Sequence, residues 1–310
     1  MPPKKIIIDT DPGIDDAMAI VLALSDPRLD LVGMTTVFGN VTTATATRNA
    51  LRLAELAGRP IPVAHGAEAP LVLAPQPPAD FVHGPEGFGD IPAAEPQGRP
   101  DPRPAHRFLV EEAAARPGEI WLVAVGPLTN LALALDEDPA VARNLAGVIV
   151  MGGAVRAPGN VSARGEANIW NDPHAADRVF AADWPLTLVP LDVTTQVICT
   201  AADFAALSEA RPGAGGFLNA AVQFYFGFHR RTRGFEGCYM HDPSAVIRLT
   251  DPGLFRTEDI PLIVHTQGDD AGRSAEAPDS GRRPVTCCLG VDAEGVRRRF
   301  LDTIREGGLP

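Results

Sequence analysis

Four aspartates within the eight residues Asp9–Asp16 (DTDPGIDD) constrain this chain more than any other feature. The motif directly follows the apolar run Ile6–Ile8 and directly precedes an apolar helical pattern over Ala17–Leu24. Capping of a helix N-terminus explains one aspartate. It does not explain four, because carboxylates that close repel one another unless a positive charge lies among them. A hard cation with oxygen ligands is the simplest counter-charge, so the motif predicts a metal site at the end of a strand.

Short apolar runs alternate with helical patterns along the chain. The predicted strands are Ile6–Ile8, Leu31–Thr36, Ile120–Val125, Val148–Met151 and Leu186–Leu191. The predicted helices are Ala17–Leu24, Thr43–Ala57, Pro173–Ala182 and Ser244–Leu249. This alternation predicts an α/β, Rossmann-like fold with a mostly parallel central sheet and helices on both faces. Because no linker divides the chain, we expect residues 1–310 to form a single domain.

Two segments interrupt this alternation. Residues 74–104 are rich in Pro and Gly and show no clear core element, and a loop of that length is usually functional or mobile. We therefore expect a mobile loop there. Residues 211–241 contain a cluster of aromatic side chains whose spacing predicts a helix, with core packing as the simplest role for the aromatics.

The charge and the cysteines limit the partners and the compartment. Acidic residues number 39 and basic residues 27, a net charge of −12, which argues against a phosphate backbone as partner. No apolar run approaches the roughly 18 residues that a membrane helix needs, and the N-terminus is too polar for a signal peptide. The four cysteines lack disulfide or zinc-site spacing. We expect a cytoplasmic protein that binds neither nucleic acid nor membrane.

Polar groups follow other predicted strands as well. The side chains concerned are Asn40, Asn160, Glu166 and Asn168. The sharp turn after Ile120–Val125 leaves the main-chain carbonyl of Val125 free to point outwards. Each residue alone is more often a turn residue, but parallel strands bring their carboxyl ends to one edge of the sheet. Together these groups form a set suited to a polyhydroxylated ligand.

The pair His241 and Asp242 precedes the short helical pattern Ser244–Leu249 and adds an imidazole and another carboxylate to the candidate site. The sequence contains no dinucleotide fingerprint, phosphate-binding loop, zinc-protease motif or serine nucleophile elbow. Carboxylates and a cation without an obvious nucleophile indicate attack by an activated water molecule.

The string DTDPGIDDAMAI resembles the signature of the inosine–uridine preferring nucleoside hydrolases. Further segments resemble this family in the same order: TTVFGNVTTATATRNAL, AVGPLTNLALAL, VIVMGGAV, PGNVSARGEANIWNDPHAA and HDPSAV. The resemblance runs from about Ile6 to Ile304. It implies the nucleoside hydrolase fold, hydrolysis of the N-glycosidic bond of ribonucleosides to ribose and free base, a role in nucleoside salvage, one bound Ca²⁺, and a homodimer or homotetramer.

The resemblance also assigns roles to individual residues. It implies that the calcium ligands are Asp11, Asp16, Asp242 and the carbonyl of Val125. It implies that the substrate contacts are Asp15, Asn40 and Asn168 on the ribose hydroxyls, Asn160 and Glu166 on the 5′-hydroxyl, and Met151 beside the sugar. Asp11 matches the general base, His241 matches a histidine that protonates the departing base, and His83 resembles a second active-site histidine on the mobile loop. We expect the loop around His83 and the segment 211–241 to lie on the base side of the substrate.

Several alternatives stay open at this point. The position between the sugar-binding glutamate and asparagine is Ala167, where many members of this family have an aromatic residue, so the preferred base is not defined. A hydrolase of a modified nucleoside or other riboside is one alternative, and a catalytically silent nucleoside- or ribose-binding protein is another. The spacing of Asp9 and Asp11 also matches a phosphatase motif, although the Asp15–Asp16 pair argues against it.

Overall fold

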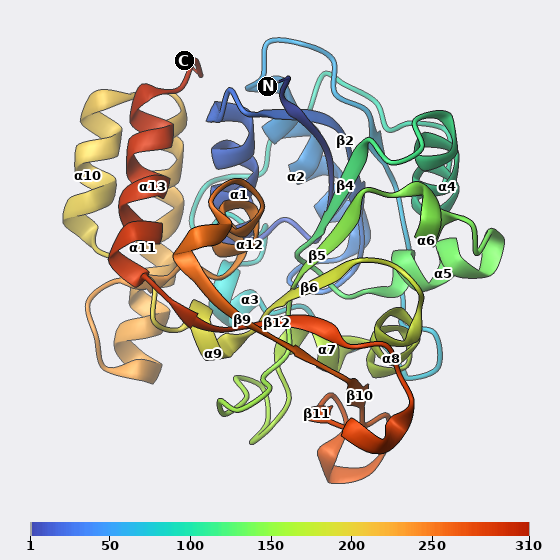
Figure 1. Ribbon diagram of the computed structural model, residues 1–310. Helices are drawn as coiled ribbons and strands as arrows, with labels where there is room; N and C mark the ends of the chain where they lie inside the picture. The colour runs from blue at the N-terminus through green and yellow to red at the C-terminus, as the bar shows by residue number, and fades with distance from the viewer. Residues whose placement is uncertain (1, 310) are drawn as a thin grey trace.

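An eight-stranded sheet crosses the computed structural model, which describes residues 2–309 (Figure 1). The strands lie in the order β3 (Val63–Ala64), β2 (Leu29–Thr36), β1 (Lys4–Thr10), β4 (Ile120–Ala124), β5 (Gly147–Met151), β6 (Leu186–Val189), β12 (Val285–Val291) and β9 (Phe255–Ile260). Neighbouring strands pair in parallel except β12 and β9, which are antiparallel. The predicted α/β class and the mostly parallel sheet are confirmed.

Two small antiparallel ribbons stand apart from this sheet. They pair β7 (Ile198–Cys199) with β8 (Cys238–Tyr239), and β10 (Leu262–Val264) with β11 (Ser274–Glu276). The first ribbon matters for the site, because β8 leads directly into the helix that begins at His241.

Helices cover both faces of the sheet. One hydrophobic cluster includes side chains of α1 (Ile14–Ser25), α2 (Thr43–Glu55), α10 (Ala201–Ala210), α11 (Ala214–Arg233), α12 (His241–Thr250) and α13 (Ala293–Glu306). A second cluster includes those of α4 (Ala105–Ala115), α5 (Thr129–Glu137), α6 (Val141–Asn144) and α8 (Pro173–Ala181). Three short helices lie in connections: α3 (Asp80–His83), α7 (Ala167–Asn171) and α9 (Leu191–Thr194).

Strand β1 shows why the sheet is covered on both sides. Ile6 and Ile8 belong to the first cluster and Ile7 to the second, since successive side chains of a strand point to opposite faces. All three are fully buried, which explains why this strand reads as a continuous apolar run.

The order of the strands fixes where a ligand can bind. From β1 the chain builds outwards in one direction through β2 and β3, and from β4 it builds in the other direction. This reversal between β1 and β4 is a topological switch point, and ligands of open α/β sheets bind at the carboxyl ends of the strands there. Asp11 and Val125 directly follow these two strands.

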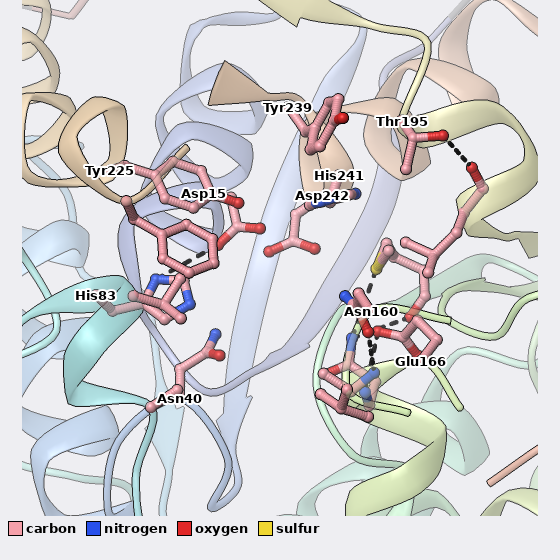
Figure 2. Close-up of a pocket in the computed structure, with 18 of the residues that line it drawn as sticks. Asp15, Asn40, His83, Asn160, Glu166, Thr195, Tyr225, Tyr239, His241 and Asp242 are labelled. Carbon is pink, nitrogen blue, oxygen red and sulfur yellow. Dashed lines mark hydrogen bonds and ion pairs between the residues drawn. The ribbon is translucent and has the colours of Figure 1, made fainter. Parts of the chain in front are cut away.

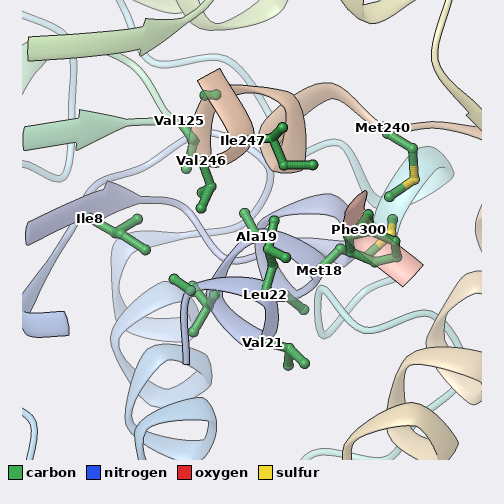
Figure 3. Packing of buried hydrophobic residues seen from close by; sticks show 14 of the residues in the cluster. Ile8, Met18, Ala19, Val21, Leu22, Val125, Met240, Val246, Ile247 and Phe300 are labelled. Atoms are coloured by element: carbon green, nitrogen blue, oxygen red, sulfur yellow. The ribbon is translucent and has the colours of Figure 1, made fainter. Parts of the chain in front are cut away.

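Helix α1 is buried on nearly all sides. It packs against α11, α12 and α13, and Figure 3 shows Met18 and Leu22 of this helix among Val246, Ile247 and Phe300. A helix that is apolar all round belongs in the interior of a protein. The N-terminal turn of α1, which carries Asp15 and Asp16, is therefore held by packing from several directions.

Two predictions about the chain path were wrong. The strand predicted over Leu186–Leu191 ends at Val189, because Pro190 has no N–H for the sheet, and α9 begins at Leu191. The segment 74–104, which showed no clear core element, does contain core structure: it includes α3, and Phe88 is fully buried with its ring 5.2 Å from that of Phe217 on α11. The mobility expected for this segment stays a prediction. The predicted helix within 211–241 is confirmed as α11.

In residues 2–309, no helix combines the length and the apolar character that crossing a membrane requires. The four cysteines Cys199, Cys238, Cys287 and Cys288 are all buried and unbridged.

Candidate active site

A cavity of about 350 Å³ opens at the carboxyl ends of the parallel strands. This volume is within the usual range of small-molecule sites, roughly 300–1,000 Å³. Its walls include these residues predicted from the sequence: Asp15, Asn40, His83, Val125, Met151, Asn160, Glu166, Asn168, His241 and Asp242 (Figure 2). The structure thus brings together residues that are up to 227 positions apart, from Asp15 to Asp242, in a single site.

Three buried carboxylates form an acidic centre at the cavity, whose lining includes Asp15 and Asp242 but neither Asp16 nor Asp11. One oxygen each from Asp15, Asp16 and Asp242 lies within 4.8 Å of the others. Asp15 and Asp16 come from the first turn of α1, and Asp242 comes from the first turn of α12. Asp15 was predicted to contact the sugar. Its distance from Asp16 and Asp242 would also allow it to bind a metal together with them.

Asp11 lies beside this centre and is held by the main chain. Its Oδ2 accepts a hydrogen bond from the Asn40 N–H at 2.6 Å, and its own N–H donates to Asp16 Oδ1 at 3.2 Å. Gly39 and Gly126 leave space for its carboxylate, since a Cβ at either position would lie 2.0 Å or 2.7 Å from an Asp11 oxygen. Within the described residues, Asp11 Oδ1 is buried and has no hydrogen-bond partner.

The electrostatics of the carboxylates point to a missing positive charge. Burial, with the nearby carboxylates adding to it, raises the pKa of Asp11 and of Asp242 well above the ordinary value and that of Asp15 to about 8. Asp15 Oδ1 is also buried and unpaired among residues 2–309. The residues therefore fit a hard divalent cation, which would occupy the unpaired oxygens and stabilise the ionised carboxylates.

Polar side chains after β5 form the opposite wall of the cavity. Glu166 caps α7 by accepting hydrogen bonds from the N–H groups of Asn168 and Ile169, and it also accepts one from Gly153. Asn168 donates from Nδ2 to the Val125 carbonyl at 3.0 Å. The Val125 carbonyl is thus turned towards the site, as the sharp turn after this strand predicted.

Two neutral histidines border the cavity. Burial lowers the pKa of His83 and of His241 to about 3. His83 Nδ1 accepts a hydrogen bond from the Ile14 N–H at 3.1 Å, so the imidazole proton must lie on Nε2. His241 Nδ1 lies 2.8 Å from Thr194 Oγ1. Neither histidine supplies the counter-charge that the carboxylates require.

The wall next to the histidines was only partly anticipated. It contains Tyr225, Phe228, His229 and Arg233 of α11, together with Tyr239. The sequence pointed to this region as the base-side segment but gave its aromatics a core-packing role, and it left His229 without a role. The spacing of Tyr225, Phe228 and His229, three and four positions apart, is the signal that places them on one face of the helix.

A parallel sheet with buried carboxylates, neutral histidines and a wall of amide and carboxylate groups around one cavity defines an α/β enzyme acting on a small polyhydroxylated molecule. The family described as "Inosine-uridine preferring nucleoside hydrolase" matches residues 6–298. The chain is 42% identical to "Probable uridine nucleosidase 2" of Arabidopsis thaliana, over 98% of each chain. It is 36% identical to the inosine-uridine preferring nucleoside hydrolase of Crithidia fasciculata, over 99% of each chain.

Solved structures agree with this assignment. A plant nucleoside hydrolase superposes with a TM-score of 0.95 at 39% identity, covering 98% of this chain and 99% of the other. A purine-preferring ribonucleoside hydrolase from Gardnerella vaginalis gives 0.93 at 32% identity, covering 97% and 98%. The chain belongs to the inosine–uridine preferring nucleoside hydrolase family. The chain is a nucleoside N-ribohydrolase. This assignment rules out the phosphatase alternative.

Proposed function

We propose that the chain is a calcium-dependent hydrolase of ribonucleosides that releases ribose and a free base for nucleoside salvage. The observation that supports this most is the buried cluster of Asp15, Asp16 and Asp242, because Asp15 Oδ1 is unpaired among the described residues and Asp15 and Asp242 line the same cavity as the sugar-binding set. A cation would be held by Asp11, Asp16, Asp242 and the Val125 carbonyl. Oxygen-only ligands favour Ca²⁺ over Zn²⁺. When bound, the cation supplies positive charge that orients the vicinal hydroxyls of ribose and acidifies a nearby water molecule.

Asp11 accepts the proton of the attacking water in this proposal. Its Oδ1 is buried and unpaired within the described residues, so it has a free lone pair for that proton. Burial and the neighbouring Asp16 raise its pKa, which makes the carboxylate a stronger base than an exposed aspartate. Breaking the glycosidic bond builds positive charge on the ribose ring, and the surrounding carboxylates stabilise that charge.

The departing base leaves next to His241. The imidazole is neutral beforehand because burial lowers its pKa to about 3. Negative charge that develops on the base raises the pKa of an adjacent imidazole. His241 therefore binds the base as a neutral imidazole, takes up a proton from solvent as negative charge develops on the base, and passes a proton to the base as the bond breaks, which returns the imidazole to its neutral form. Asn160, Glu166 and Met151 contact the sugar from the cavity wall formed by the end of β5 and the residues after it. His83 lies beside Asp15.

A reducing-sugar assay with inosine, adenosine, guanosine, uridine and cytidine tests the proposed reaction. We expect ribose to be released from at least one of them. Binding of nucleosides without release of sugar would support the silent binding protein instead, and activity confined to modified nucleosides would support the other riboside alternative.

Metal binding is tested without measuring activity. Crystals grown with Ca²⁺ should show one ion with six to eight oxygens at roughly 2.3–2.6 Å, contributed in part by Asp11, Asp16, Val125 and Asp242. Chelation should lower the Tm of the protein, because the cation binds the folded state only. Asp242→Asn should abolish this shift, whereas Asp269→Asn, at an exposed position, should keep it. An ion held by histidine or cysteine would contradict the assignment.

A further inference from the structure

His229 occupies a place in the cavity that the mechanism above does not use. It lies on α11 and lines the cavity together with Tyr225 and Tyr239. Its Nδ1 lies 2.9 Å from the carbonyl oxygen of Tyr225. A carbonyl oxygen only accepts hydrogen bonds, so Nδ1 must carry the imidazole proton. Burial lowers the pKa of His229 to about 4, which keeps the ring neutral and leaves Nε2 with a lone pair.

The orientation of this ring is fixed on several sides. Its centroid lies 4.3 Å from the ring of Tyr225, 5.0 Å from Tyr239, 5.2 Å from Phe235 and 5.3 Å from Phe228. A flip of the imidazole would break the hydrogen bond to the Tyr225 carbonyl. Because Nδ1 points back to the helix, Nε2 lies at the tip of the side chain, away from the main chain.

His229 stands between the two histidines already described. His83 stacks on Tyr225 at 5.7 Å, and Tyr239 lies 5.4 Å from His241 (Figure 2 shows the four rings). The rings thus form a continuous wall from His83 through Tyr225, His229 and Tyr239 to His241. The sugar-binding groups Asn160 and Glu166 line the same cavity from a different loop, so the base of a bound nucleoside faces this wall.

We propose that His229 determines which bases are accepted, by accepting through Nε2 a hydrogen bond from a ring N–H of the base. This inference rests on the proposed hydrolysis of ribonucleosides and specifies the base. Uracil has such an N–H at N3 and hypoxanthine at N1, each flanked by a carbonyl. Cytosine and adenine carry a lone pair at the corresponding position, which would face the lone pair of Nε2 and leave both unpaired. His83, with its proton on Nε2, supplies a donor suited to a carbonyl oxygen.

The proposed rule depends on the hydrogen-bonding edge and not on the size of the base. The relatives include both a probable uridine nucleosidase and a purine-preferring hydrolase, so similarity alone does not select a ring size. The rule selects uridine over cytidine and inosine over adenosine. Each pair has nearly the same shape, and the members differ in the donor or acceptor that they present.

His229→Phe tests this proposal because it keeps an aromatic ring and removes the acceptor. The ratio of kcat/KM for uridine to that for cytidine should fall by about ten- to a hundredfold, the effect of leaving one buried polar group unpaired. The same fall is expected for inosine against adenosine. His106→Phe, on α4 and outside the cavity, serves as the matched control and should leave both ratios unchanged.

A second variant keeps the test decisive if the first one folds poorly, which the Tm of each variant will reveal. His229→Gln can turn its amide to donate or to accept, so it should serve both kinds of base and bring each ratio close to one. Ratios that stay at the wild-type value in both folded variants would overturn the role of His229 while leaving the hydrolase intact. Wild-type protein that releases no ribose from any nucleoside would instead contradict the proposed function.

Discussion

Uridine is expected to exceed 2′-deoxyuridine in kcat/KM by roughly 10⁴-fold, because a site built to bind a hydroxyl rejects the analogue that lacks it. The groups proposed to bind the ribose hydroxyls include Asp15, Asn40 and Asn168, which line the cavity and are buried or nearly so. Removal of the 2′-hydroxyl leaves these groups and the cation without a partner. Steady-state release of uracil from both substrates measures the discrimination.

5′-Deoxyuridine provides the matched comparison. It lacks only the hydroxyl proposed to meet Asn160 and Glu166, and Glu166 already accepts three main-chain hydrogen bonds in the structure. We expect a smaller loss for this substrate than for 2′-deoxyuridine. Comparable rates on uridine and 2′-deoxyuridine would refute the assignment of Asp15, Asn40 and Asn168 to the sugar.

His241→Ala should slow the hydrolysis of natural nucleosides by roughly 10²–10⁴-fold, the usual contribution of general acid–base catalysis. A p-nitrophenyl riboside releases a stable anion that needs no proton, so its hydrolysis should lose much less. Asp11→Ala should slow both kinds of substrate, since both require the activated water. Measurement of both variants with uridine and with the p-nitrophenyl riboside separates protonation of the leaving group from activation of the attacking water.

Thr194 offers a finer control for the same experiment. Its Oγ1 lies 2.8 Å from His241 Nδ1 and fixes the orientation of the ring. Thr194→Val should therefore reproduce part of the loss on uridine and spare the p-nitrophenyl riboside in the same way. Equal losses on both substrates in His241→Ala would mean that His241 supports ribose binding or the shape of the site. His83 would then be the better candidate for the acid.

The strand-end residues could be predicted because their chemistry conflicts with any structural role. Four clustered aspartates after a buried strand require a counter-charge whatever fold the rest of the chain adopts. A parallel sheet brings such strand ends together. The sequence therefore anticipated both the fold class and the meeting of Asp15, Asn40 and Asp242 in one cavity. It also anticipated that the Val125 carbonyl turns outwards.

The base-side wall could not be predicted in the same way. Tyr225 and His229 repeat at helical spacing, which is equally the pattern of a helix packed in a core. The hydrogen-bond partner of each ring atom distinguishes a side chain that lines a cavity from one that is packed in a core. For His229 that partner is the main-chain carbonyl of Tyr225, which fixes the tautomer and has no signal in the sequence. Phe88 was missed for a related reason: the surrounding Pro and Gly residues hid a single core side chain within a loop.

The hydrogen bond between the Ile14 N–H and His83 makes two segments that are distant in the sequence depend on each other. Gly13, the residue before α1, has no side chain to cap the helix, and His83 accepts the first amide of the helix instead. A Cβ on Gly13 would lie 2.6 Å from His83 Nδ1, so the glycine also makes room for this distant cap. Loss of a cap costs about 0.5–2 kcal/mol. A chimaera that takes the 74–104 segment from a relative must therefore keep an aromatic ring nitrogen at position 83 that accepts this hydrogen bond. Without it, the turn that carries Asp11, Asp15 and Asp16 loses a stabilising contact.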